Sequence, residues 1–149
     1  MIDRSDWVAT VTAARDGGQV FFDFLTAVDH EAEGFEVVVH LWDPAARQGA
    51  LLSTACPRED PVVPTLVGVF AGAGWHERAA AELFGIRFEG HETTPLLLSE
   101  RFDGHPLRKD FLLASRSARP WPGAKDPGES EADLATSTRR RPRPPGVPG

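Results

Sequence analysis

The chain has 149 residues, of which 41% are hydrophobic and 26% are charged, and its formal net charge is −6. This composition is typical of one soluble globular domain, and the acidic balance argues against binding to nucleic acid, because phosphates require clustered Lys and Arg. The single cysteine, Cys56, excludes a disulfide framework and an iron–sulfur cluster held by this chain alone.

The first predicted element is a helix near the N-terminus. Asp3 or Ser5 can cap it, Trp7 and Val11 lie on one apolar stripe, and Gly17 follows its last turn. The stripe indicates a helix with one buried side.

Three strands are predicted after this helix. Residues 24–28 are mostly apolar, and residues 35–42 are rich in the β-branched and aromatic side chains that favour strands. Residues 50–55 are expected to pair with residues 35–42 as a hairpin. Three prolines within residues 57–64 predict a connector, because proline cannot donate to a central ladder.

The clearest helix is predicted over residues 75–84. Its apolar stripe has i, i+4 spacing and comprises Trp75, Ala79, Ala80, Leu83 and Phe84. Glu77, Arg78 and Glu82 fall outside this stripe, which predicts a solvated face. Gly85 is expected to adopt the left-handed conformation after the last turn. Because helices and strands do not alternate strictly, the pattern predicts an α+β fold.

The C-terminal part of the chain differs in composition from the rest. Residues 1–113 have a net charge of −9, from 9 basic and 18 acidic side chains, whereas residues 114–149 have a net charge of +3. The second range is rich in proline and poor in aliphatic residues, so we expect a largely disordered tail after a domain at residues 1–113. Arg139 and its neighbours form the one basic cluster of this tail.

The sequence offers no pattern for catalysis, cofactor binding or a metal site. No nucleophile motif or phosphate-binding loop is present, and Cys56 is best interpreted as a small buried residue. The histidines lack the spacing of a metal site; they are His30, His40, His76, His91 and His105. An enzyme that uses His91, His105 and a carboxylate stays open as an alternative, as does an interaction module that binds anions through its arginine tail.

A second polar cluster lies near the end of the predicted domain. Arg108, Lys109 and Asp110 follow a rigid turn made of Gly104, His105 and Pro106. Rigid turns with exposed charges suit docking, because part of the ordering entropy is already lost. We therefore expect this cluster to contact neighbouring proteins.

Residues 75–91 and 102–111 resemble the two signature segments of the 30 kDa-subunit family of respiratory complex I. Residues 24–29, 35–41 and 60–66 fit the same family in order. The positions taken as interface or signature residues are Trp75, Glu77, Arg78, Glu82, Phe84, Gly85, His91, Gly104, His105, Pro106, Arg108, Lys109 and Asp110. Ala79 and Ala81 depart from the family pattern, which usually has Glu and Tyr there, and favour a divergent paralogue.

The resemblance implies a two-layer α+β domain with a mixed sheet and an extended C-terminal segment. It implies a non-catalytic structural subunit of the peripheral arm of a proton-translocating NADH-quinone oxidoreductase, next to the quinone-site 49 kDa-type subunit and cluster-bearing subunits. NADH, flavin, iron–sulfur clusters and quinone would belong to the assembly and none to this chain. No 18-residue apolar run and no signal-peptide pattern is present, so the expected location is peripheral, on the cytoplasmic face of the bacterial plasma membrane, through the complex.

Overall fold

The computed structural model describes residues 1–99 and 102–112. The elements follow the order η1 (Arg4–Asp6), α1 (Trp7–Asp16), β1 (Phe21–Asp29), η2 (Glu31–Glu33), β2 (Phe35–Asp43), β3 (Gln48–Cys56), β4 (Val62–Pro64), α2 (Ala73–Phe84) and β5 (Arg87–Glu89). The predicted α+β class is confirmed. The expected disordered tail, residues 114–149, lies outside the described residues.

The larger sheet is an antiparallel meander in the order β1-β2-β3. Its register places Leu25 opposite Val39, and Val39 opposite Leu52. Side chains alternate between its two faces, so Leu25 and Val39 point into the core. Strand β1 begins three residues before the predicted strand, because a register shift between Phe22 and Phe24 lets it continue beside β2.

The smaller sheet pairs β4 with β5 in parallel, with Val63 opposite Phe88. Helix α2 lies between these two strands in the chain, as parallel pairing requires. The prediction of a plain connector over residues 57–64 was therefore wrong for its last three residues. Pro64 is tolerated because it ends the strand, where the next amide, that of Thr65, donates to the Glu89 carbonyl at 3.0 Å.

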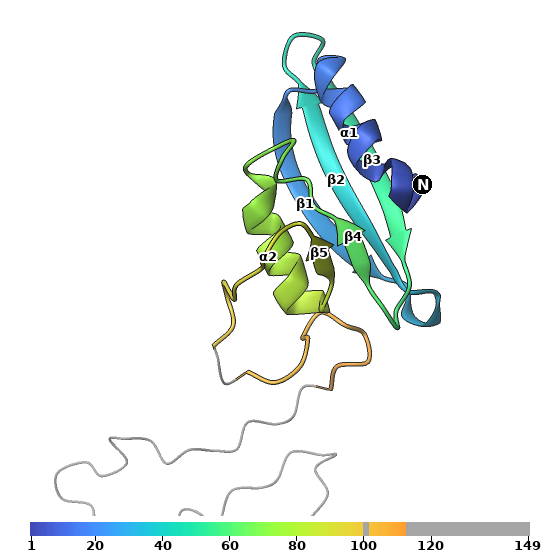
Figure 1. The fold of residues 1–149 in the computed structure, drawn as a ribbon, viewed down its shortest axis with the longest axis vertical. Helices are drawn as coiled ribbons and strands as arrows, with labels where there is room; N and C mark the ends of the chain where they lie inside the picture. Colours follow the sequence, from blue (N-terminus) through green and yellow to red (C-terminus); the bar gives the residue numbers. More distant parts are fainter. Residues whose placement is uncertain (100–101, 113–149) are drawn as a thin grey trace, which may run out of the picture. The chain divides into compact units, whose positions relative to one another are not determined.

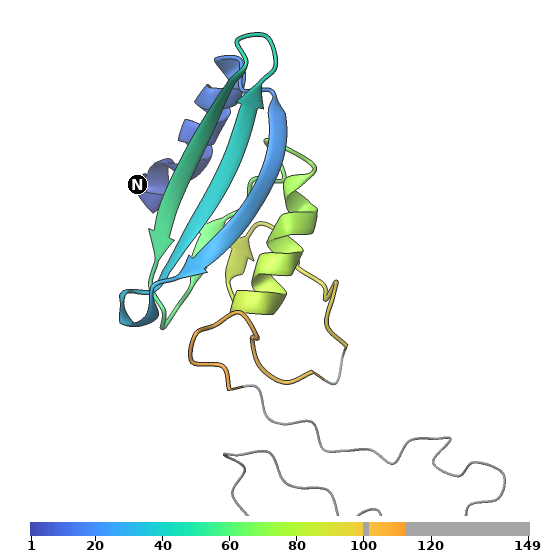
Figure 2. The same ribbon diagram turned by 180° about the vertical axis from the view of Figure 1, so that it is seen from behind.

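Both helices and the smaller sheet cover the same face of the meander (Figure 1), and the view from behind shows the other face in front (Figure 2). We call this second face the outer face. The core between the layers joins Trp7 and Val11 of α1 to Val37 of β2 and to Ala80 and Phe84 of α2. Cys56 is buried at the end of β3, as predicted. Burial raises the pKa of its thiol to about 11, so the thiol is protonated at neutral pH.

Helix α2 begins two residues earlier than predicted and buries a different stripe. Its buried residues are Ala73, Glu77, Ala80 and Phe84. Trp75, predicted to pack on the sheet, is 61% exposed, whereas Glu77, predicted to face solvent, is fully buried. The apolar pattern misplaced the stripe because the Glu77 carboxylate has hydrogen-bond donors inside the domain, which offset its desolvation.

Both free edges of the meander are partly occupied by other groups. Nδ1 of His76 lies 3.4 Å from the Leu25 amide nitrogen and 3.2 Å from its carbonyl oxygen, on the edge of β1. On the edge of β3, the Ile2 amide donates to the Ser53 carbonyl at 2.7 Å. Edges blocked in this way resist pairing with a further strand.

No helix within the described ranges is long and apolar enough to cross a membrane.

Candidate functional site

The centre of the site is the buried carboxylate of Glu77. It accepts hydrogen bonds from the Thr65 hydroxyl at 2.7 Å, from the Leu66 amide at 2.7 Å and from Nδ1 of His91 at 2.8 Å. Thr65 and Leu66 follow β4, and His91 follows β5. One side chain of α2 therefore fixes the ends of both strands of the smaller sheet, and charge-assisted bonds of this kind are stronger than neutral ones.

Two further side chains of α2, those of Arg78 and Glu82, bind residues 94–98, which we call the α2 loop. The Arg78 guanidinium donates to the carbonyls of Thr94 and Pro95, both at 2.9 Å. Glu82 accepts from three successive backbone amides of the α2 loop, which are those of Leu96, Leu97 and Leu98. Arg78 and Glu82 therefore stabilise the α2 loop. Their i, i+4 spacing also permits an ion pair within the helix, but the main contacts of both side chains are with the α2 loop.

The charge of Glu82 is stabilised by the α2 loop. Burial raises the pKa of this carboxyl, but the hydrogen bonds from the Leu97, Leu98 and Leu96 amides and the nearby Arg78 charge outweigh it, so the pKa is lowered overall. The carboxylate is therefore ionised at neutral pH and holds the α2 loop in that form.

Trp75 lies on the solvent side of α2, beside this arrangement. Its ring lies 5.1 Å below the Arg78 guanidinium carbon, so the arginine that holds the α2 loop also orients an exposed indole. A large exposed aromatic ring fixed in this way suits a protein contact, because little side-chain freedom is left to lose.

The end of α2 is fastened to residues 102–112, which we call the C-terminal segment. Gly85 adopts the left-handed conformation with φ of 74°, as predicted. Nε of Arg108 donates to the Phe84 carbonyl at 2.6 Å, and Nδ1 of His105 donates to the Glu82 carbonyl at 2.8 Å. Two carbonyls of the last helical turn thereby gain partners from the C-terminal segment.

Gly104 and Pro106 lie in the turn that brings these two side chains to the helix. Gly104 has φ of 96°, and the Phe111 ring lies against it. The Phe111 ring also stacks on Phe102 at 5.8 Å between centroids. This packing folds the C-terminal segment back on itself, so His105 and Arg108 both reach α2.

A charge cluster ties the C-terminal segment to the sheet. The buried carboxylate of Asp29, at the end of β1, accepts from the Lys109 amide at 2.9 Å, the Glu31 amide at 2.7 Å and Arg58 at 2.7 Å. Burial raises the pKa of Asp29, but these three donors lower it by more, so the carboxyl titrates below its usual range. Asp29 is therefore an ionised anchor inside the domain.

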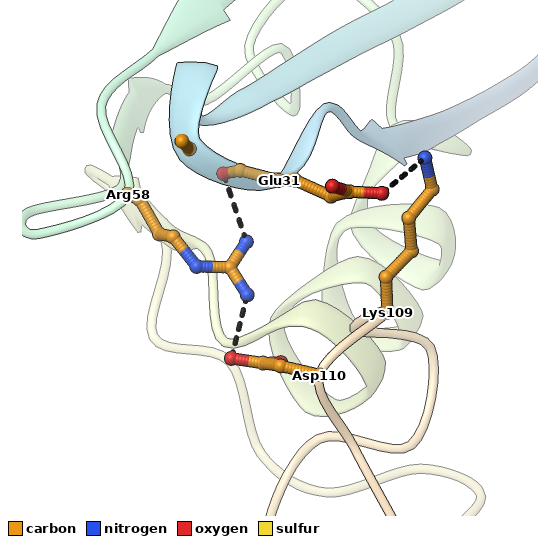
Figure 3. Close-up of a pocket in the computed structure, with 5 residues that line it drawn as sticks. Glu31, Arg58, Lys109 and Asp110 are labelled. Carbon is orange, nitrogen blue, oxygen red and sulfur yellow. Dashed lines mark hydrogen bonds and ion pairs between the residues drawn. The ribbon is translucent and has the colours of Figure 1, made fainter.

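Arg58 is the cation at the centre of this cluster (Figure 3). Its guanidinium contacts Asp29, the Glu31 carbonyl and Asp110, the last at 2.8 Å. Asp110 is the main cause of the raised pKa of Arg58, and Nζ of Lys109 lies 3.4 Å from Glu31. A surface pocket is lined by Arg58, Glu31, Lys109, Asp110 and Ala32.

The Phe35 ring contacts two guanidinium groups, with the Arg58 carbon at 5.2 Å and the Arg108 carbon at 5.3 Å from the ring centroid. Cation–π contacts of this kind hold both arginines over the sheet. Arg108, Lys109 and Asp110, which we predicted to dock on neighbouring proteins, therefore each make a contact inside this chain. Their role toward neighbours stays a prediction.

Asp29, Arg58 and Thr65 were not predicted from the sequence as residues of the site. Asp29 ends a strand in step with the inward residues Leu25 and Ala27, and this alternation was a usable signal for its burial. Arg58 and Thr65 lie in irregular segments, and only the assembled fold brings them to their carboxylates.

The two histidines of the enzyme alternative have separate partners: His91 bonds to Glu77, and His105 bonds to a backbone carbonyl of α2. Within residues 1–99 and 102–112, no group of three or more His, Cys, Asp or Glu residues is placed to hold a metal ion. The arrangement is suited to fixing segments against one another and to presenting a rigid surface.

Solved structures share this fold. A fragment of Nqo5 has a TM-score of 0.56 with 26% sequence identity, over 61% of this chain and 77% of that chain. A chain of the membrane-bound sulfane sulfur reductase, an archaeal respiratory membrane complex, has a TM-score of 0.70 with 27% identity, over 75% of this chain and 69% of that chain. The fold thus defines an α+β domain of the kind found in Nqo5 and in that complex.

The sequence comparisons identify the family. The family described as the 30 kDa subunit of respiratory-chain NADH dehydrogenase matches residues 1–117, and the chain belongs to this family. The NADH-quinone oxidoreductase C 2 subunit of Rhizobium meliloti is 41% identical over 123 residues. The NADH-quinone oxidoreductase C subunit of Rhodopseudomonas palustris (strain TIE-1) is 43% identical over 118 residues.

These matches cover 78% and 75% of this chain. The chain spans 67% of the length of the first relative and 57% of the length of the second. The resemblance seen in the sequence is therefore confirmed, and these homologues are the C subunits of bacterial NADH-quinone oxidoreductases.

Proposed function

We propose that this chain is a non-catalytic structural subunit of the peripheral arm of a proton-translocating NADH-quinone oxidoreductase. It supports electron transfer from NADH to quinone by positioning the quinone-site 49 kDa-type subunit and the cluster-bearing subunits. The observation that supports this most directly is the family match over residues 1–117, together with relatives near 40% identity that are named as the C subunit of that enzyme.

The rigid arrangement around α2 supports a scaffolding role. Glu77, Glu82 and Asp29 each join segments that are distant in the sequence, and each accepts three hydrogen bonds. A surface fixed before assembly loses less conformational entropy on binding. We propose that Trp75 and the exposed parts of Lys109 and Asp110 contact neighbouring subunits, while Gly85, His91, His105 and Arg108 maintain the shape behind them.

NADH, flavin, iron–sulfur clusters and quinone belong, in this proposal, to other subunits of the assembly. The chain joins the membrane only through that complex, at the cytoplasmic face. Residues 1–113 form the part that assembles, and residues 114–149 have a net charge of +3.

Affinity purification from detergent-solubilised membranes tests this function. The full chain is tagged, and its partners are identified by mass spectrometry. Recovery of the quinone-site and cluster-bearing subunits in near-equal amounts is the expected result. Recovery of the chain alone, as a monomer, would overturn the proposal.

A further inference from the structure

The helices cover only one face of the meander and leave the outer face uncovered (Figure 2). Several of the outward-facing side chains are nevertheless large and apolar. The register of the meander aligns Phe24, His40 and Leu51 in one row across the three strands. The next row includes Phe21 and Trp42. Leu51 is 65% exposed and Phe21 is 55% exposed. An antiparallel sheet with one solvated face normally places polar residues there, so this face has the composition of a contact surface.

The blocked edges of the meander favour a contact through this face. His76 occupies the β1 edge at Leu25, and Ile2 pairs with the β3 edge at Ser53. Addition of a strand from another protein is hindered at both places. An element that packs flat on the outer face meets no such obstacle.

The charges on the outer face are negative. Asp23 and Glu36 are its carboxylates, and among the outward-facing side chains of the three strands none is Lys or Arg. Asp23 lies 2.8 Å from Nδ1 of His40, and Glu36 lies 3.0 Å from Nε2 of His30. A second copy packed on this face about a two-fold axis would bring like charges together, which disfavours a homodimer.

We propose that the outer face docks a different protein subunit, whose contact surface is apolar and bears Lys or Arg side chains that meet Asp23 and Glu36. This inference rests on the proposed function, which supplies an assembly of several subunits. Beyond the proposed function, the inference identifies the surface of this chain that makes the contact and the chemistry of the partner surface. The apolar rows supply the buried area, and the two carboxylates supply orientation and selectivity.

The test compares two substitutions at one position in the tagged full chain. Leu51→Lys and Leu51→Glu both remove the apolar side chain, but they add opposite charges. Against a cationic partner, Leu51→Lys is expected to lower the recovery of co-purified subunits by about tenfold, the scale of one central interface residue. Leu51→Glu is expected to lower it by less.

Ala13→Lys is the control, because Ala13 is an exposed residue of α1, on the covered side of the sheet. Wild-type recovery with Leu51→Lys, or a larger loss with Leu51→Glu, overturns the inference. Ala55→Lys, at another exposed outward position of β3, repeats the test if Leu51→Lys does not fold, as judged by circular dichroism.

Photo-cross-linking identifies the occupant. A benzophenone amino acid in place of Leu51 is expected to link the chain to one co-purified subunit. A link to a second copy, or to residues 114–149 of the same chain, overturns the inference. If the wild-type chain recovers no subunit, the proposed function fails as well. If the wild type recovers them and Leu51→Lys does so equally, only the docking face fails.

Discussion

Nδ1 of His91 lies 2.8 Å from Oε2 of the fully buried Glu77. The contact joins the middle of α2 to the residue that follows the smaller sheet, across 14 positions of the chain. The same carboxylate accepts from the Leu66 amide, so the C-terminal ends of both parallel strands depend on one side chain. Removal of the Glu77 side chain therefore leaves the Leu66 amide and His91 without their acceptor, which is unfavourable inside the domain.

Glu77→Ala is expected to lower the free energy of unfolding by about 3 kcal/mol, because the donors of Thr65, Leu66 and His91 lose their acceptor. Urea unfolding of the purified domain measures this loss. Glu92→Ala, at an exposed position after β5, should change stability by no more than about 0.5 kcal/mol. Equal effects of the two variants would contradict a structural role for the buried carboxylate.

Gly85→Ala is expected to destabilise the domain by at least about 1–2 kcal/mol, because an L-residue is strained in the left-handed conformation. A Cβ atom there would also overlap the Arg108 guanidinium and the His105 ring. Gly68→Ala is the matched control, since nothing lies within 4 Å of the added atom. Thermal unfolding of both variants separates the two cases, and an unchanged Gly85→Ala protein would contradict the fastening of the C-terminal segment.

Asp29→Asn is expected to lower the free energy of unfolding by about 3 kcal/mol at neutral pH, because Arg58 and the amides of Lys109 and Glu31 lose a buried charged acceptor. The pKa of Asp29 is lower in the folded protein than in the unfolded chain. Its carboxylate therefore stabilises the fold fully above the unfolded-state pKa of about 3.9, and this stabilisation is lost as pH falls through the folded-state pKa. Urea unfolding between about pH 3 and pH 7 should therefore show the difference from wild type shrinking at acid pH.

Asp60→Asn is the control for that series. Asp60 is exposed and lies 3.9 Å from the exposed Arg87, and exposed pairs contribute little. A difference between wild type and Asp29→Asn that stays constant with pH would show that the charge of Asp29 is not what stabilises the domain.

Glu82→Gln is expected to accelerate hydrogen exchange at the Leu96, Leu97 and Leu98 amides by about tenfold, because one of the two acceptor oxygens becomes a donor. Exchange elsewhere in α2 should change little. Glu89→Gln, at an exposed position of β5, should leave these three amides as in the wild type. Unchanged exchange in Glu82→Gln would mean that the α2 loop is held by other contacts.

The sequence predicted the elements whose signals are local. Helix α1, the β2–β3 hairpin and Gly85 followed from periodicity, β-branched composition and cap chemistry. Strands β4 and β5 were missed, because three residues give no period and their pairing spans helix α2. Trp75 was wrongly predicted to be buried and Glu77 to be exposed. Hydropathy alone does not reveal the hydrogen-bond donors, distant in the sequence, that stabilise the buried Glu77 carboxylate.

Several residues of the candidate site were predicted from the sequence, but the contacts that they make were not. Glu82, His105 and Arg108 were named from the sequence, but their partners are backbone carbonyls and amides, which have no residue-type signal. Asp29 and Arg58 were not named, because their pairing depends on how β1 ends beside the C-terminal segment.

The contact between the Lys109 amide and Asp29 closes a loop of 80 positions, whereas the meander β1-β2-β3 is made of neighbouring segments. Local pairings form faster than contacts between distant positions, because less chain entropy is lost. We therefore expect the meander to form early in folding and the Asp29 cluster to form last. During synthesis on the ribosome, the Asp29 carboxylate would then lack one of its three donors, the Lys109 amide, until residue 109 has emerged, and the domain would reach full stability only after that point.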